Sequence, residues 1–162
     1  MTKIVLAAFL AALLAACAGN PLTGYAVQPG TPRDAVIARL GQPTRVVRLP
    51  EGERLQYSLQ PMGQYAWMVD LDTSGRVLGS RQVLTLADFN RIEVGRWNRA
   101  DVEREFGPPG IVDVVASWNG PIMTYRWYDG SDMFYHVYLD QASVVRRAHQ
   151  AMELRGAREL RD

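Results

Sequence analysis

The sequence predicts an α+β fold built from two tandem repeats, each a short helical segment packed on an antiparallel β-meander sheet. Two observations support this prediction. The motif Leu-Gly-Gln-Pro at residues 40–43, typical of a helix end, recurs as Phe-Gly-Pro-Pro at residues 106–109. After each motif, the hydrophobic residues change from helical spacing to strict alternation. With 162 residues and 48% hydrophobic content, the chain can bury one large core or two small ones.

The two halves match at a nearly constant distance along the chain. Leu40 and Phe106 are separated by 66 residues, and two additional residues in the second half raise the separation to 68 further on. The pairs that match at 68 are Tyr57 and Tyr125, Val69 and Val137, Leu71 and Leu139, Asp72 and Asp140, and Val77 and Val145. A constant separation across whole strand segments indicates a tandem duplication.

Each repeat is expected to begin with a capped helix. In the first, Thr31 can cap the helix, with Pro32 at its first position and Asp34 near the positive end of the helix dipole. In the second, Asn98 is the expected cap and Asp101 lies in the first turn. The glycine of each repeated motif ends its helix, and the prolines that follow prevent the helix from resuming.

The rest of each repeat is expected to form a four-stranded antiparallel meander with one face packed on the helix. The residues predicted by alternation to face the core are Leu55, Tyr57, Leu59, Tyr65, Trp67, Val69 and Leu71 in the first repeat, and Met123, Tyr125, Trp127, Met133, Tyr135, Val137 and Leu139 in the second. Between the repeats, residues 86–92 have hydrophobic residues at helical spacing, which predicts a short helix leading into the second repeat.

The N-terminal segment predicts export and lipidation. Lys3 precedes an apolar run of 13 residues, 4–16, which is too short to span a bilayer and fits the hydrophobic region of a signal peptide. The run ends in Leu-Ala-Ala-Cys, which resembles a bacterial lipobox, so Cys17 is the expected lipid attachment site. A plain signal peptide with an incidental cysteine is the alternative. Because Cys17 is the only cysteine, its lipidation would leave no free thiol in an oxidising compartment.

These observations predict five segments along the chain. They are a lipoprotein signal peptide at 1–16, a tether at 17–29, a first repeat at 30–84, a linker helix with a second repeat at 85–149, and a charged tail at 150–162. The tether is inferred from Gly, Pro, Asn and Thr without periodicity. The tail is charged and compatible with a frayed helix.

The order of motifs in each repeat resembles the SmpA/OmlA, or BamE-like, domain family. The resemblance covers residues 30–84 and 93–149, with a glycine, a helix ending in Leu-Gly-x-Pro, a tyrosine-containing strand and a hydrophobic strand running into Asp-x-x-Gly. The second repeat departs from the pattern, with Gln-Ala-Ser at 141–143 in place of the glycine turn. The resemblance implies a non-catalytic accessory or scaffold in outer-membrane protein assembly and envelope integrity. Its implied partner is an envelope protein, such as the barrel-assembly machinery.

The same resemblance implies a location at the periplasmic face of the outer membrane, held there by the lipid anchor. Ala18 follows the cysteine, where aspartate would be the usual signal for retention in the inner membrane. A tandem pair of this fold is also similar to the beta-lactamase inhibitory proteins, which bind enzymes through a concave sheet. The alternative function is therefore a periplasmic inhibitor-like module that holds an enzyme with both sheets. This alternative requires the outer faces of the two sheets to line one concavity.

No catalytic residues are expected. His136 and His149 are the only histidines, and no Gly-x-Ser-x-Gly elbow is present. Residues 70–75 resemble the start of a calcium loop, but the twelfth position is Arg81 rather than glutamate, so a hairpin turn explains them better. A net charge of +1 gives no electrostatic reason for nucleic-acid binding. We therefore expect no enzyme activity and no metal, cofactor or small-molecule substrate.

The candidate functional surface is the sheet face of the second repeat that points away from its helix. The residues on this face by alternation are Arg126, Tyr128, Phe134, His136 and Tyr138. Aromatic residues with an arginine are typical of protein-recognition patches. The residues on the corresponding, blander face of the first repeat are Gln56, Ser58, Ala66 and Met68. The alternative is that the aromatic face packs against the first repeat or the tail.

Overall fold

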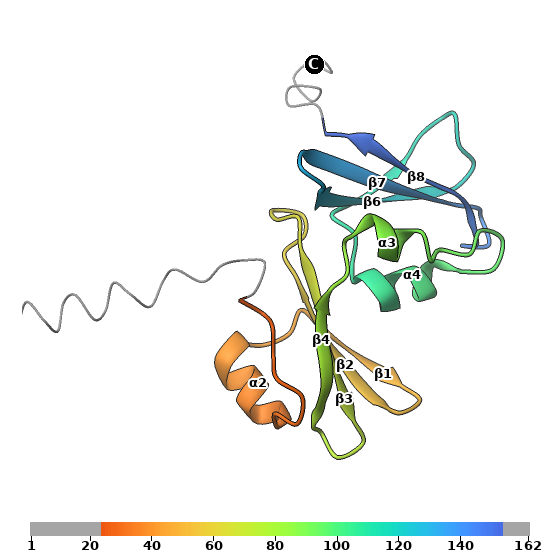
Figure 1. The fold of residues 1–162 in the computed structure, drawn as a ribbon. Coiled ribbons are helices and arrows are strands. Elements are labelled where there is room, and N and C mark those ends of the chain that lie inside the picture. Colours follow the sequence, from red (N-terminus) through yellow and green to blue (C-terminus); the bar gives the residue numbers. More distant parts are fainter. Residues whose placement is uncertain (1–23, 154–162) are drawn as a thin grey trace, which may run out of the picture.

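The protein, seen in a computed structural model that describes residues 24–153, has an α+β fold with two four-stranded antiparallel sheets and few helices (Figure 1). The elements of the first half are α2 (Arg33–Leu40), β1 (Arg45–Leu49), β2 (Gly52–Ser58), β3 (Ala66–Asp72) and β4 (Val77–Gln82). Those of the second half are α3 (Leu86–Phe89), α4 (Arg99–Phe106), β5 (Ile111–Val114), β6 (Pro121–Tyr128), β7 (Asp132–Leu139) and β8 (Val145–Met152). Each sheet is a simple meander, in the order β1-β2-β3-β4 or β5-β6-β7-β8.

The helix ends of the two halves are built in the same way. Gly41 and Gly107 end α2 and α4 with φ values of 82° and 80°, a region that favours glycine. In each half a tyrosine of the second strand holds this glycine: the hydroxyl of Tyr57 donates to the carbonyl of Gly41 at 3.1 Å, and that of Tyr125 to Gly107 at 2.9 Å. The matched tyrosines therefore have the same structural role.

The last hairpin of each half is also equivalent. Gly75 has φ 75°, and Ser143, which replaces the expected glycine, has φ 62°. The backbone N–H of Arg33 donates to Gly75, and that of Arg99 donates to Ser143, both at 2.9 Å. The departure in sequence at 141–143 thus leaves the backbone geometry of the turn intact.

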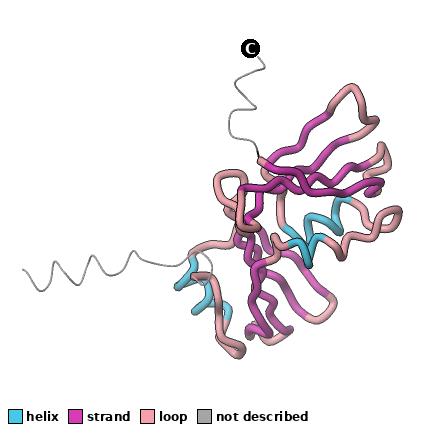
Figure 2. The backbone as a smooth tube through the Cα atoms, turned by 45° about the horizontal axis from the view of Figure 1, so that its top comes forward, coloured by secondary structure: helices cyan, strands magenta, loops and turns pink. Residues whose placement is uncertain are grey.

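The layers follow the order α2, first sheet, α3 with α4, second sheet (Figures 1 and 2). The first core lies between α2 and the first sheet and contains Val27, Val36, Leu55, Tyr57, Trp67, Val69, Leu71 and Val77. The second core surrounds α3 and α4 and includes Phe89, Val102, Phe106, Tyr125, Trp127 and Val137. Ala66 and Met68, from the other face of the first sheet, belong to this second core. The helices of the second repeat are therefore covered by sheets on both sides.

The helix caps were predicted correctly in one repeat and wrongly in the other. The Asn98 side chain accepts from the N–H groups of Ala100 and Asp101, and the Asp101 carboxylate accepts from Asn98 N–H, which completes a capping box. In the first repeat Pro32, not Thr31, is the N-cap, and α2 begins at Arg33. No side chain caps this helix start, and the Thr31 hydroxyl instead donates to the carbonyl of Gln28 at 2.7 Å.

Two predicted boundaries need correction. Residues 24–29 do not behave as a tether, because Val27 is buried and its N–H donates to Ser80 at 2.8 Å. The ring of Tyr25 also lies 5.7 Å from that of Tyr57, so this segment fills one end of the first core. At the other end, β8 continues to Met152, so residues 150–152 are strand rather than tail. The signal peptide, Cys17 and residues 17–23 of the tether lie outside the described residues.

Candidate protein interface on the second sheet

Strand pairing places all five predicted interface residues on one face of the second sheet. Arg126 on β6 lies opposite Phe134 on β7, Tyr128 lies opposite Asp132, and Ile122 lies opposite Tyr138. β8 adds a third strand to this face, because His136 lies opposite His149 and Tyr138 lies opposite Arg147. We call this surface the open face, since α3 and α4 pack on the other side of the sheet (Figure 1). It comprises Ile122, Thr124, Arg126, Tyr128, Phe134, His136, Tyr138, Arg147 and His149.

Five rings form a continuous ladder across the open face. Trp118, in the loop after β5, meets Tyr138 edge-on with ring centroids 5.1 Å apart. Tyr138 stacks on His149 at 5.3 Å, and His149 lies 5.5 Å from His136. Phe134 follows at 5.8 Å from His136. All five side chains are only partly buried, so the ladder presents ring surface to solvent.

One cation and two hydrogen bonds accompany the ladder. The guanidinium of Arg147 lies 5.0 Å from the centre of the Tyr138 ring, a cation–π geometry. The indole Nε1 of Trp118 donates to the carbonyl of Leu139 at 2.7 Å, which fixes the first ring. Nδ1 of His136 lies 2.9 Å from the hydroxyl of Thr124. These contacts hold Trp118, Tyr138 and His136 in place within the chain.

The two histidines of the ladder are held in their neutral form. Burial lowers the pKa of His136, and His149 lowers it further, against a smaller opposite effect of Asp113. Burial also lowers the pKa of His149, and the positive charge of Arg147 adds to this effect. At neutral pH the open face therefore has two uncharged imidazoles beside one arginine.

Arg126, one of the five predicted residues, is occupied within the chain. Its guanidinium forms two contacts of 2.9 Å with the Glu153 carboxylate and donates to the carbonyl of Pro61 at 3.0 Å. Its backbone is paired as well: the Gln60 side-chain amide accepts from Arg126 N–H at 3.1 Å and donates to Arg126 C=O at 2.6 Å. The expected alternative, packing against the first repeat and the C-terminal segment, therefore holds for Arg126. Tyr128, in contrast, is 50% exposed.

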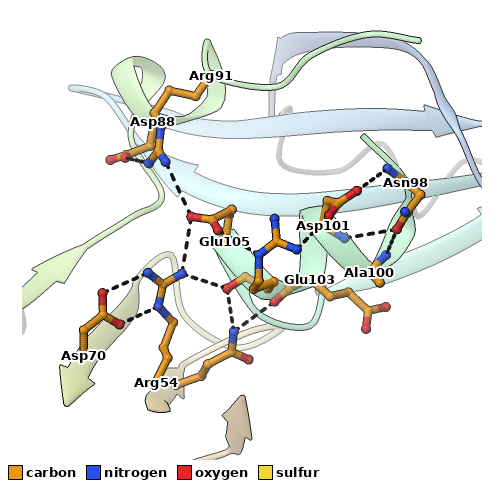
Figure 3. Close-up of polar contacts among 11 residues, drawn as sticks. Arg54, Asp70, Asp88, Arg91, Asn98, Ala100, Asp101, Glu103 and Glu105 are labelled. Atoms are coloured by element: carbon orange, nitrogen blue, oxygen red, sulfur yellow. Dashed lines mark hydrogen bonds and ion pairs between the residues drawn. The ribbon is translucent and has the colours of Figure 1, made fainter. Parts of the chain in front are cut away.

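The outer face of the first sheet is covered by α4 (Figure 3). The Gln56 amide donates to the carbonyls of Glu103 at 2.9 Å and Arg104 at 3.0 Å, two of the last carbonyls of the helix. Arg54 also donates to Arg104 C=O at 3.1 Å and forms ion pairs with Asp70 and Glu105. The outer faces of the two sheets consequently do not line one common surface.

The acidic turn of the first repeat is a hairpin turn. The Asp72 carboxylate accepts hydrogen bonds from the N–H groups of Ser74 at 2.8 Å and Arg76 at 3.0 Å, and the Ser74 hydroxyl also donates to it. These hydrogen bonds, led by that of the Ser74 hydroxyl, lower the pKa of Asp72. Among residues 24–153 no cluster of three or more His, Cys, Asp or Glu is arranged to hold a metal ion. No helix within that range is both long and apolar enough to cross a membrane.

Sequence reasoning missed Arg147 and His149 of the open face, and it missed Trp118, whose ring extends the ladder from the loop after β5. Alternation along β8 contains the signal for Arg147 and His149, but a register shift beside Tyr138 and Leu139 hides which parity faces outward. Trp118 lies in a turn, where periodicity gives no information about direction.

Comparisons with known proteins add little to this geometry. No protein-family model matches the sequence, and no curated protein matches it. A similar solved structure is that of YjgB, a DUF4309 family protein from Bacillus subtilis subsp. subtilis str. 168, with 16% sequence identity and a TM-score of 0.31. The match covers 76% of this chain and 79% of that chain. At this TM-score the likeness supports no argument about fold or function.

Proposed function

We propose that this chain is a non-catalytic lipoprotein, anchored through Cys17 at the periplasmic face of the outer membrane, that docks an envelope protein on its open face. The proposal rests on a difference between two equivalent sheet faces, of which one is covered by a helix and the other is not. In the first repeat this face is buried under α4, whereas in the second it presents a ladder of partly exposed rings with an arginine. Exposed aromatic and arginine side chains on a rigid sheet are the usual anchors of protein interfaces.

The lipobox and the resemblance to the SmpA/OmlA, BamE-like family support the location and the role in envelope assembly. A membrane-anchored chain with a rigid, outward-facing docking surface suits an accessory to a larger assembly, such as the barrel-assembly machinery. The inhibitor-like alternative is less well supported, because an enzyme held by both sheets needs both outer faces accessible, and Gln56 and Met68 are buried.

Two experiments test this proposal. Replacing Cys17 by serine should move the chain from the membrane fraction to the soluble periplasmic fraction; continued acylation and membrane binding would contradict the anchor. A photo-cross-linking amino acid at Tyr128 should capture an envelope protein, whereas the same group at Leu78 on β4, which is 56% exposed, should not. Capture of a soluble hydrolase would favour the inhibitor-like function. Equal capture at both positions would show that the open face has no special role.

A further inference from the structure

β8 is an edge strand, and half of its outer edge has no partner within the described chain. It ends the second sheet in the order β5-β6-β7-β8 (Figure 1). The backbone of Val145 faces away from β7, because its N–H donates to Trp97 and its carbonyl accepts from Gly95, both at 2.8 Å. The segment 95–97 therefore covers the first part of this edge. Beyond it, no segment of residues 24–153 pairs with the outer side of β8.

The parity of the strand identifies the backbone groups that point outward. The N–H of Glu153 donates to the carbonyl of Asp132 at 2.9 Å, so the backbone of Glu153 faces β7. Opposite residues of antiparallel strands alternate between pairs that exchange hydrogen bonds and pairs that do not. Counting back from Glu153 through the register with β7, the residues whose N–H and C=O point outward are Ala148, Gln150 and Met152. The outward groups of these three residues have no hydrogen-bond partner among residues 24–153.

The matching edge in the first repeat is covered by the chain itself. There, residues 27–31 run along β4. The Ser80 hydroxyl accepts from the N–H of Val27 at 2.8 Å and donates to its carbonyl at 3.2 Å. At a separation of 68 residues, β8 has Ala148 in place of Ser80, and alanine has no hydroxyl to form this bridge. The described chain thus covers the edge of β4 and leaves the edge of β8 beyond Val145 open.

The open part of β8, residues 148–152, also lacks the charged side chains that protect the other sheet edges. Charges on an edge strand discourage pairing with a second chain. The other three edge strands have such residues, which are Arg45 and Arg48 on β1, Arg81 on β4 and Asp113 on β5. Residues 148–152 contain no Asp, Glu, Lys or Arg, and Met152 is 64% exposed. Among the four edges, this one is therefore the best suited to receive another strand.

From the parity, the missing cover and the missing charges, we infer that β8 pairs with β8 of a second copy of this chain, antiparallel and about a twofold axis at Gln150. This register is the one that pairs all three outward residues with one another. Gln150 lies opposite Gln150 of the second copy, and Ala148 lies opposite Met152 of the second copy. Each of these pairs exchanges two N–H···O=C hydrogen bonds. Because a twofold contact is closed, the pairing ends at two copies.

The side chains beside the axis are complementary in this register. Arg147 lies opposite Glu153 of the second copy, and opposite charges directly across two strands are favourable. Among residues 24–153 Arg147 forms no ion pair, and its contact is with the Tyr138 ring. On the other side of the sheet, the exposed Met152 lies beside the small Ala148 of the second copy. A twofold axis perpendicular to the sheet keeps both open faces on the same side, so pairing joins them into one continuous sheet.

Sedimentation of the full chain tests the pairing, with Cys17→Ser to remove the proposed lipid site. We expect a concentration-dependent dimer between about 1 and 300 µM, the range of a small interface. Gln150→Pro should weaken the dimer at least about tenfold, because it removes the N–H at the axis. Proline is tolerated in an edge strand where its nitrogen faces outward, so the fold should persist. The matched control is Gln150→Ala, which keeps the N–H and should keep the dimer.

Disulfide formation tests the register without a proline. In the Cys17→Ser chain, Gln150→Cys introduces the only thiol. Opposite residues of a hydrogen-bonded pair have Cα atoms about 5.5 Å apart, a distance that a disulfide spans. We expect mild oxidation to link two copies through position 150. Val114→Cys is the control, because Val114 is 78% exposed and lies on β5, at the opposite edge of the same sheet.

Several outcomes would overturn this inference. They are a chain that stays monomeric over the whole concentration range, a dimer that Gln150→Pro leaves unchanged, and equal linking at positions 150 and 114. A dimer that forms only after removal of residues 154–162 would assign the edge to the chain's own end. If Gln150→Pro lowered the melting temperature strongly, disulfide linking would decide. The inference does not depend on the proposed docking function, since capture of an envelope protein at Tyr128 is measured separately.

Discussion

Arg54 joins the two repeats, and replacing it with methionine should destabilise the protein strongly. Its side chain is only 8% exposed and makes two hydrogen bonds to Asp70, at 2.6 and 2.9 Å, besides contacts with Glu105 and Arg104 C=O of α4. The substitution keeps the unbranched apolar stem of the side chain but leaves Asp70, Glu105 and the carbonyl of Arg104 without their donor. Breaking one partner of a buried ion pair costs about 3 to 5 kcal/mol.

The lower end of that range, about 3 kcal/mol, is the better expectation for Arg54→Met. The Asp70 side chain is 32% exposed and can regain water, and Glu105 keeps Arg91 at 3.6 Å and Arg104 at 3.1 Å. Urea unfolding with a fixed m-value would measure the change in the free energy of unfolding. In the double variant with Asp70→Asn, part of the loss should be recovered, because the unpaired carboxylate is gone.

The control for this prediction is an arginine on the surface. Arg96 pairs with Glu93 at 2.6 Å, but its side chain is 80% exposed. Arg96→Met should therefore change the free energy of unfolding by no more than about 1 kcal/mol. If Arg54→Met cost no more than Arg96→Met, Arg54 would not stabilise the contact between the repeats, and the explanation of how α4 is received would be wrong.

Three further predictions concern the matched tyrosines, the histidine pair and the exposed aromatic residue. Tyr125→Phe should lower the free energy of unfolding, measured in urea, by about 1 to 3 kcal/mol, because it leaves the buried carbonyl of Gly107 without its donor. Tyr57→Phe should lower it less, since Gly41 is exposed. The folded pKa values of His136 and His149 are lowered, so the unfolded chain binds protons first, and stability should fall as pH drops below about 6.5. His149→Gln should weaken this pH dependence, measured as the slope of the free energy of unfolding against pH. An unchanged slope between about pH 6.5 and 5 would contradict the prediction. Tyr128→Ala should leave the melting temperature nearly unchanged and reduce partner capture, and a large drop in melting temperature would show that this side chain has a structural role.

Local patterns in the sequence predicted much of the fold and part of the interface. Alternation fixes which strand residues share a face, so it placed Tyr128, Phe134, His136 and Tyr138 together, and strand pairing confirms this. The capping box at Asn98 was also readable, because it depends on residues only three positions apart.

The parts that escaped prediction depend on contacts between distant segments. Arginine is typical of binding surfaces, yet Arg126 is already bonded within the chain. Its carbonyl accepts from Gln60 and its guanidinium donates to Pro61, about one repeat away in sequence. Alternation likewise placed Gln56 on the sheet face away from its own helix, but not under α4, which lies 47 residues further along the chain. Alternation says which side of a sheet a residue lies on, but not what will cover that side.

Within residues 24–153 the two equivalent sheet faces differ in what covers them: α4 lies on the first face, and no described helix lies on the open face. In a stacked array each repeat covers its neighbour, and the terminal repeat usually ends in a polar surface that keeps the array soluble. Here the second repeat covers the first, because Gln56 and Arg54 donate hydrogen bonds to the last carbonyls of α4. The open face instead has Thr124 and Ile122 at the positions of those polar donors and carries a ladder of rings beside Arg147. A purely structural face would gain nothing from exposed aromatic rings and from an arginine that forms no ion pair among residues 24–153, so its composition favours a docking role.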